Sequence, residues 1–79
     1  MELNLAVSQR IQELLVQNDM TRYRLSVLSG LPRSTVSNIV NCTYPSVKLS
    51  IIHDLCQGFG IDIQEFFSSP LFNEENLDP

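Results

Sequence analysis

Four side chains between positions 33 and 38 could form the hydrogen bonds that recognise base pairs. Arg33, Ser34, Ser37 and Asn38 recur at i, i+1, i+4 and i+5, so a helix places them on one face. An arginine can donate two hydrogen bonds to O6 and N7 of guanine, and an asparagine can pair with N6 and N7 of adenine. The segment from about Pro32 to Asn41 is therefore predicted to be a helix that reads base edges in the major groove of DNA.

The outer face of this predicted helix is unusual for a helix that only faces solvent. It carries short polar side chains and no acidic residue, whereas exposed helix faces usually carry pairs of Glu and Lys. Arg33 in the first turn opposes the positive end of the helix dipole, a small cost that a bound phosphate or base would offset. The alternative is that these are exposed polar side chains without a ligand.

A second group of residues could bind the DNA backbone at the start of the preceding helix. This helix is predicted from Thr21 to Ser29, with the Thr21 hydroxyl as its N-cap. The free N–H groups of a helix N-terminus suit an anion, and Arg22 adds a positive charge there. We expect a phosphate at this point; the alternative is a plain cap beside a solvated arginine.

The distribution of charge supports DNA binding more than the total does. The net charge is −4 and the isoelectric point is about 4.6, which argues against a generic nucleic-acid binder. From Met20 to His53, however, there are four basic residues and no acidic one, while the other residues include nine acidic and one basic. Screening limits the reach of charges to about 8–10 Å, so this segment can still attract DNA locally. The alternative is that so few basic residues are scattered by chance.

The composition bounds the class of protein. With 79 residues, 43% of them hydrophobic and 18% charged, the chain is expected to form one folded domain. Cys42 and Cys56 form no CxxC pair and His53 is the only histidine, so no metal site or cofactor is predicted and both thiols are expected to be reduced. No apolar run approaches the ~18 residues of a membrane span, and no signal peptide is evident, so a cytoplasmic protein is expected.

The elements that must position these side chains are predicted to be helical throughout. Apolar residues recur at helical spacing, for example at Val7, Ile11, Leu14 and Leu15, and no strand pattern is present. Leu25 and Leu28 are expected to face inward. Gly30 is expected to end its helix with a positive φ. The predicted helices are Ala6 to Asn18, Thr21 to Ser29, Pro32 to Asn41, Leu49 to Phe59 and, capped by Asp62, Ile63 to Phe67.

The C-terminal residues 68–79 are polar, acidic and bounded by prolines. We expect this acidic tail to be frayed or to lie against a neighbour, outside a domain formed by residues 1–67. Phe66, Phe67, Leu71 and Phe72 form an apolar cluster at the junction. It is a candidate homodimer surface; the alternative is that it closes the core.

An enzymatic function is not predicted. Ser50, His53 and Asp54 are spaced to share a helix face, but a catalytic triad also needs an oxyanion hole and a substrate cleft. A helical domain this small rarely forms either, so no small-molecule substrate is expected.

The residues around Gly30 are similar to those of the Cro/repressor-type helix-turn-helix family, also called XRE-like. The resemblance rests on Thr21, Leu25, Ser29-Gly30, Leu31, Arg33-Ser-Thr-Val-Ser37, Ile39 and the distal Gly60-Ile-Asp-Ile-Gln-Glu-Phe-Phe67, and covers about Arg10 to Phe67. It implies a compact all-α, five-helix bundle of the lambda-repressor-like DNA-binding type, with helices 2 and 3 forming the helix-turn-helix. The third helix would enter the major groove.

Carried over by position, the resemblance implies a set of DNA contacts. The base-contacting residues would be Arg33, Ser34, Ser37 and Asn38, and the phosphate-contacting residues would be Thr21, Arg22, Asn41, Thr43, Tyr44 and Lys48. The hydroxyl of Tyr44 could instead simply cover the loop. Where the family often has Gly after helix 3, this chain has Cys42, so Asn41 or Cys42 must take the turn.

The predicted function is therefore a sequence-specific transcriptional regulator of the repressor type. The family usually binds double-stranded DNA at pseudo-palindromic operators as a two-fold dimer, with half-sites about one helical turn apart. The alternative is a protein-interaction module, such as an antitoxin-like partner-binding domain, with weak or no DNA binding. The acidic isoelectric point and the few lysines favour that alternative.

Overall fold

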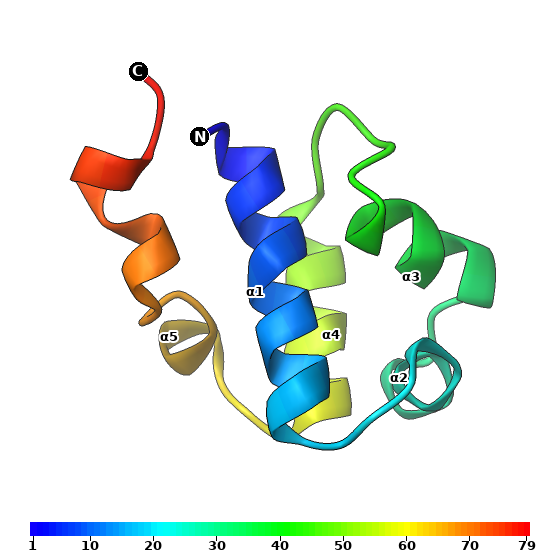
Figure 1. Cartoon of the computed structure of the whole chain (residues 1–79). Helices are drawn as coiled ribbons and strands as arrows, with labels where there is room; N and C mark the ends of the chain where they lie inside the picture. Colours follow the sequence, from blue (N-terminus) through cyan, green and yellow to red (C-terminus); the bar gives the residue numbers. More distant parts are fainter.

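The computed structural model describes residues 1–79 and consists of helices and turns only (Figure 1). The elements are α1 (Leu3–Gln17), α2 (Arg22–Ser29), α3 (Arg33–Val40), α4 (Leu49–Phe59), α5 (Ile63–Phe66) and the short 3₁₀ turns η1 (Pro70–Phe72) and η2 (Glu74–Asn76). In Figure 1, α1 and α4 lie in the centre, α2 and α3 on one side, and α5 with the C-terminal turns on the other. None of these helices is long and apolar enough to cross a bilayer.

The core is a single hydrophobic cluster to which all five helices contribute. The predicted apolar stripe of α1 is confirmed, because Val7, Ile11, Leu14 and Leu15 are all buried. The prediction for Leu28 was wrong: its side chain is 43% exposed. α2 packs on α4 through Leu25 and Ser29, which lie one turn apart on the same face of the helix. Leu28 is rotated about 100° from Ser29 and so lies outside this face.

The helix boundaries follow the local capping signals. Asp62 caps α5 as predicted, since its Oδ1 accepts a hydrogen bond from the Glu65 N–H at 2.7 Å. α4 has the predicted bounds. Pro32 and Asn41 prove to be the caps of α3 rather than part of it. α1 begins at Leu3, earlier than the predicted Ala6. Leu3 and Leu5 are exposed and do not belong to the apolar stripe, so the pattern did not reveal this start.

Two residues in the left-handed region set the turns on either side of α3. Gly30 ends α2 at φ 75° and its N–H donates to the Ser26 carbonyl, as predicted for a glycine in this position. Cys42 takes the turn after α3 at φ 57°, and its N–H donates to the Ile39 carbonyl at 3.1 Å. A non-glycine residue costs about 1 kcal/mol in this conformation. Cys42 thus ends α3 although it is less favourable there than glycine.

α2 and α4 approach closely at Gly58. A β-carbon added to Gly58 would lie 3.0 Å from Leu25 Cδ1 and 3.1 Å from Ser29 Cβ. Leu25 is fully buried and cannot move aside into solvent. The absence of a side chain at Gly58 therefore lets α2 lie directly on α4, and this contact sets the position of α2.

We expect Gly58→Ala to lower the free energy of unfolding by about 1 kcal/mol. Overpacking in a filled core costs about 1–3 kcal/mol, while alanine gains up to about 1 kcal/mol of helix propensity. Urea denaturation followed by circular dichroism measures the difference. The matched control is Gln57→Ala, at the exposed neighbouring position of α4, which should unfold like the wild type. A Gly58→Ala protein as stable as the control would show that α2 is free to shift away from α4.

A buried arginine joins α1 to α5. The side chain of Arg10 is only 7% exposed, its Nε donates to the Phe66 carbonyl at 2.7 Å, and its Nη2 donates to the Glu65 carbonyl at 2.9 Å. Its Nη1 also lies 3.3 Å from Oε1 of Glu13. The guanidinium thus binds the carbonyls at the end of α5, where a cation is favoured. The sequence analysis did not identify this role.

The C-terminal tail lies against α1. The Ser69 hydroxyl is buried and donates to Glu13 of α1 at 3.1 Å. The N-terminal ammonium of Met1 donates to the Asn76 carbonyl at 2.7 Å and lies 3.2 Å from the carboxylate of Asp78. Of the two predictions for the tail, contact with a neighbouring element is the one that the structure supports.

The aromatic cluster at the end of the chain helps to close the core. Phe66 is fully buried, and the ring of Phe67 stands edge-on to it at 4.9 Å between centroids. Phe72 packs edge-on against Phe67 at 4.8 Å. Phe67, Leu71 and Phe72 remain half-buried, so a part of this cluster still faces solvent.

Both cysteines carry free thiols. Cys56 lies in the core, where desolvation raises the pKa of its thiol and the nearby negative charge of Asp62 adds to the effect. The thiolate is the reactive form of cysteine, so this shift makes Cys56 an inert core residue.

Candidate nucleic-acid interface

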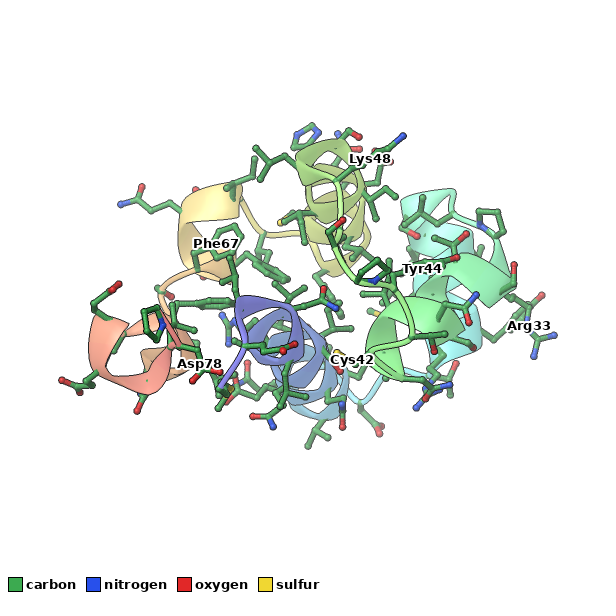
Figure 2. The ribbon with its side chains drawn as sticks, turned by 90° about the horizontal axis from the view of Figure 1, so that it is seen from above. Arg33, Cys42, Tyr44, Lys48, Phe67 and Asp78 are labelled. Carbon is green, nitrogen blue, oxygen red and sulfur yellow. The ribbon has the colours of Figure 1, made fainter.

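The predicted reading face of α3 points away from the core. Val36, Ile39 and Val40 are buried and hold the helix on the body of the molecule. Arg33 and Ser34 are exposed, and Ser37 and Asn38 are half-buried. Figure 2 shows the Arg33 side chain extending outward at one end of the molecule.

The start of α2 lies beside the end of α3. The Thr21 hydroxyl accepts a hydrogen bond from the Arg24 N–H at 3.0 Å, so Thr21 is the predicted N-cap. Arg22 is exposed, and its Nη1 donates to Oδ1 of Asn41 at 3.1 Å. This contact brings together two predicted phosphate-binding residues that are 19 positions apart in the sequence. The N–H groups of Arg22 and Tyr23, which precede Arg24, have no partner within the helix, so they too are available to an anion.

The loop between α3 and α4 carries the other predicted phosphate-binding residues. Thr43 and Lys48 are exposed, and Lys48 directly precedes α4 (Figure 2). Tyr44 is half-buried, and its hydroxyl accepts a hydrogen bond from Nδ2 of Asn38 at 3.2 Å. Tyr44 is thus joined to the reading face of α3, a contact that neither of the two predictions for its hydroxyl included.

Two polar side chains of α1 hold α3 and this loop in place. The buried Ser8 hydroxyl donates to the Val40 carbonyl at 2.6 Å, at the end of α3. Nδ2 of Asn4 donates to the Tyr44 carbonyl and lies 3.5 Å from the sulfur of Cys42. Neither role was predicted from the sequence. The only signal of a buried polar contact is Ser8, a small polar residue next to the apolar stripe of α1.

An aromatic contact joins the first residues of α2 and α3. The guanidinium carbon of Arg33 lies 5.0 Å from the centre of the Tyr23 ring. This distance is within the range of a cation–π interaction, which is worth about 0.5–1 kcal/mol at an exposed site. Tyr23 was not identified from the sequence, because the contact depends on the angle between the two helices.

The exposed arginines of α2 and α3 lie away from the acidic C-terminal tail. Arg22, Arg24 and Arg33 are exposed on α2 and α3. Figure 2 shows Arg33 and Asp78 at opposite ends, with the acidic tail on the far side of α1 from α3. No three metal-ligating side chains come together anywhere in the chain. The helices α2 and α3 thus carry three exposed arginines and no acidic residue.

Comparisons with known proteins assign the family. A sequence model of the Cro/C1-type HTH DNA-binding domain matches residues 10–70. The structure is similar to the crystal structure of the prophage Lp1 protein 11, with a TM-score of 0.80 and 31% sequence identity over 94% of this chain and 99% of that one. No curated protein sequence matches the chain. The five-helix, lambda-repressor-like fold is thereby confirmed, and the chain belongs to the Cro/C1-type helix-turn-helix DNA-binding family.

Proposed function

We propose that the protein is a sequence-specific transcriptional repressor that reads the major groove with α3. The observation that carries this proposal is the polar outer face of α3, which lies beside the N-terminus of α2 and itself carries no acidic residue. A similar protein comes from a prophage, which suits a regulator of this kind. DNA binding itself is the property of the family to which the chain belongs.

Each polar side chain on α3 has a defined task in this proposal. Arg33 donates to O6 and N7 of a guanine, and Asn38 pairs with N6 and N7 of an adenine. The hydroxyls of Ser34 and Ser37 accept from or donate to the neighbouring bases. Each bidentate pair discriminates against a wrong base by about 1–3 kcal/mol, so Arg33 and Asn38 supply most of the specificity.

Phosphate contacts on both sides of α3 fix its position in the groove. Thr21, Arg22 and the first amides of α2 bind one phosphate, and Asn41 lies beside Arg22 on the same side. Thr43, Tyr44 and Lys48 bind the backbone from the loop. Because phosphate contacts carry no sequence information, these residues set the affinity and the register of the protein.

The modest positive charge of one copy favours binding as a homodimer. Only Arg22 and Lys48 are basic among the proposed phosphate contacts, so a single copy releases few counterions and binds DNA weakly. Two copies related by a two-fold axis would bind a pseudo-palindromic operator with half-sites about one helical turn apart. The half-buried apolar residues Phe67, Leu71 and Phe72 of the C-terminal region are the proposed contact between the copies.

The phosphate contact of Arg22 is tested by the salt dependence of binding. Arg22→Ala should weaken binding to all sequences alike and lower the slope of log K against log salt by about 1. Titrations by fluorescence anisotropy between about 50 and 200 mM salt measure the slope. The control is Gln64→Ala, at an exposed position of α5, which should bind like the wild type. An unchanged slope for Arg22→Ala would place this side chain away from the phosphates.

A protein-interaction module is the second candidate function. The observation that favours it is an open apolar recess of about 220 Å³ between the start of α1 and the residues before α4. Leu3 and Leu49, which line it, are 56% and 74% exposed, more than is usual for leucine. A folded protein that binds no DNA at low salt or at about 200 mM, and that recovers a protein partner, would favour this candidate over the repressor.

A further inference from the structure

We propose that two tyrosines outside α3, Tyr23 and Tyr44, position the base-reading side chains and thereby set the base preference of the protein. Tyr23 holds Arg33, and Tyr44 holds Asn38. This inference rests on the proposed reading of DNA by α3 and adds two positioning residues to it. Neither tyrosine needs to touch a base for this role.

Tyr23 restricts the motion of the most exposed side chain on the reading face. Arg33 stands in the first turn of α3, and α3 itself supplies no partner for its side chain. The ring of Tyr23, on the first turn of α2, lies 5.0 Å from its guanidinium. A cation–π contact uses none of the N–H groups of the guanidinium as hydrogen-bond donors, so they stay free to bind a base. An arginine held in this way loses less conformational freedom when it binds guanine than a free one does.

Tyr44 holds the Asn38 side chain in place. Its hydroxyl accepts one of the two N–H bonds of Nδ2 at 3.2 Å. The other N–H and Oδ1 remain free, and these are the donor and acceptor that pair with N7 and N6 of adenine. In the inverted orientation the tyrosine hydroxyl would donate to Oδ1 instead, so the contact holds the Asn38 side chain in place in either case. In the orientation of the structure, the groups that pair with adenine stay free.

The positions of both tyrosines are themselves fixed by the fold. The carbonyl of Tyr44 accepts a hydrogen bond from Asn4 of α1. Tyr23 lies on α2, which is seated on α4 at Gly58. The two contacts come from different elements and act on α3 five residues apart, so each should affect one base position and leave the other unchanged.

The test measures base discrimination by Tyr23→Leu, Tyr23→Phe and Tyr44→Phe. Binding is measured on a duplex selected by the wild type from a random pool, and on versions of it with single base-pair changes. The base positions read by Arg33 and Asn38 are first located with Arg33→Ala and Asn38→Ala. Tyr23→Leu should reduce discrimination about two- to fivefold at the Arg33 position only. Tyr44→Phe should reduce it about two- to tenfold at the Asn38 position only.

Conservative and matched variants separate positioning from other roles. Tyr23→Phe keeps the ring and should keep the discrimination of the wild type. If Tyr23 instead bound a phosphate through its hydroxyl, Tyr23→Phe would weaken all duplexes equally. Tyr23→Leu should also cause no further loss of discrimination when Arg33 is already alanine. The control Val27→Ala, at an exposed position of the same helix, should leave all positions unchanged.

Two results would overturn the proposal. One is unchanged discrimination in both Tyr23→Leu and Tyr44→Phe; the other is an equal loss at every base position, which would indicate a shift of the whole helix. A measurement without DNA keeps the failure of this proposal distinct from the failure of the proposed function. In the free wild type, NMR should show Arg33 side-chain protons shifted by the Tyr23 ring, and the shift should vanish in Tyr23→Leu. If that shift is present but the wild type selects no sequence, α3 does not read DNA, and the proposed positioning role is wrong as well. If the shift is absent, the contact between Tyr23 and Arg33 does not form and the proposal is wrong on its own.

Discussion

Arg10→Met is expected to lower the free energy of unfolding by about 3 kcal/mol. Hydrogen bonds to charged groups contribute about 1.5–3 kcal/mol each, and Arg10 makes two of them to backbone carbonyls, those of Phe66 and Glu65. Methionine fills a similar volume but donates nothing, so the Phe66 carbonyl loses its buried partner. Because Arg10 joins α1 to α5, the loss should destabilise the attachment of α5 and of the tail behind it.

Thermal or urea denaturation followed by circular dichroism measures the effect of Arg10→Met. For a domain of this size, each 1 kcal/mol corresponds to a change of about 4–8 °C in Tm. The matched control is Arg24→Met, the same change at an exposed arginine of α2, which should alter stability by less than about 0.5 kcal/mol. Arg10→Lys keeps the charge but not the planar fork and should fall between the two. Equal stability of Arg10→Met and Arg24→Met would contradict the role given to Arg10.

Arg33→Ala is expected to lower affinity for the preferred duplex by about 1–3 kcal/mol while leaving the fold intact. The loss should be concentrated at one base pair, where the variant accepts bases that the wild type rejects. Stability should change by less than about 0.5 kcal/mol, because the loss of the contact with Tyr23 is offset by the removal of an exposed cation from the unfavourable end of the helix dipole. Anisotropy titrations against duplexes with single base-pair changes measure both the affinity and the preference.

Arg33→Lys separates the charge of Arg33 from its geometry. Lysine keeps the positive charge but is a point charge without the bidentate fork. The salt dependence of binding should therefore stay close to that of the wild type, while the preference for guanine weakens. If Arg33→Lys and Arg33→Ala both kept the wild-type preference, Arg33 would not be a base-reading residue.

The features that the sequence predicted well depend on local signals. Gly30 takes a positive φ and ends α2, and Asp62 caps α5, because each feature is decided by one residue and the amides next to it. The bounds of α4 follow from a clear apolar stripe that ends before Gly60, which takes a φ of 72°. The outward face of α3 was likewise predicted from the spacing of Arg33, Ser34, Ser37 and Asn38.

The features that the sequence did not predict depend on contacts between distant elements. Leu28 belongs to an apolar pattern but is exposed, because α2 contacts Gly58 of α4 through Leu25 and Ser29. Arg10 looks like an ordinary surface cation until α5 is placed beside α1. The contacts of Tyr23 and Tyr44 require the angle between α2 and α3 and the path of the loop after α3, and neither is encoded in residue spacing.

Selection of bound sequences from a random duplex pool tests the central claim, that α3 reads DNA sequence, most directly. The purified protein should enrich a pseudo-palindromic site with half-sites about one helical turn apart. Selection with Arg33→Ala and with Asn38→Ala should each erase the preference at one position of the half-site, at a guanine and at an adenine respectively. A folded wild-type protein that enriches no sequence over the starting pool, or whose selected site is unchanged in both variants, would contradict the account.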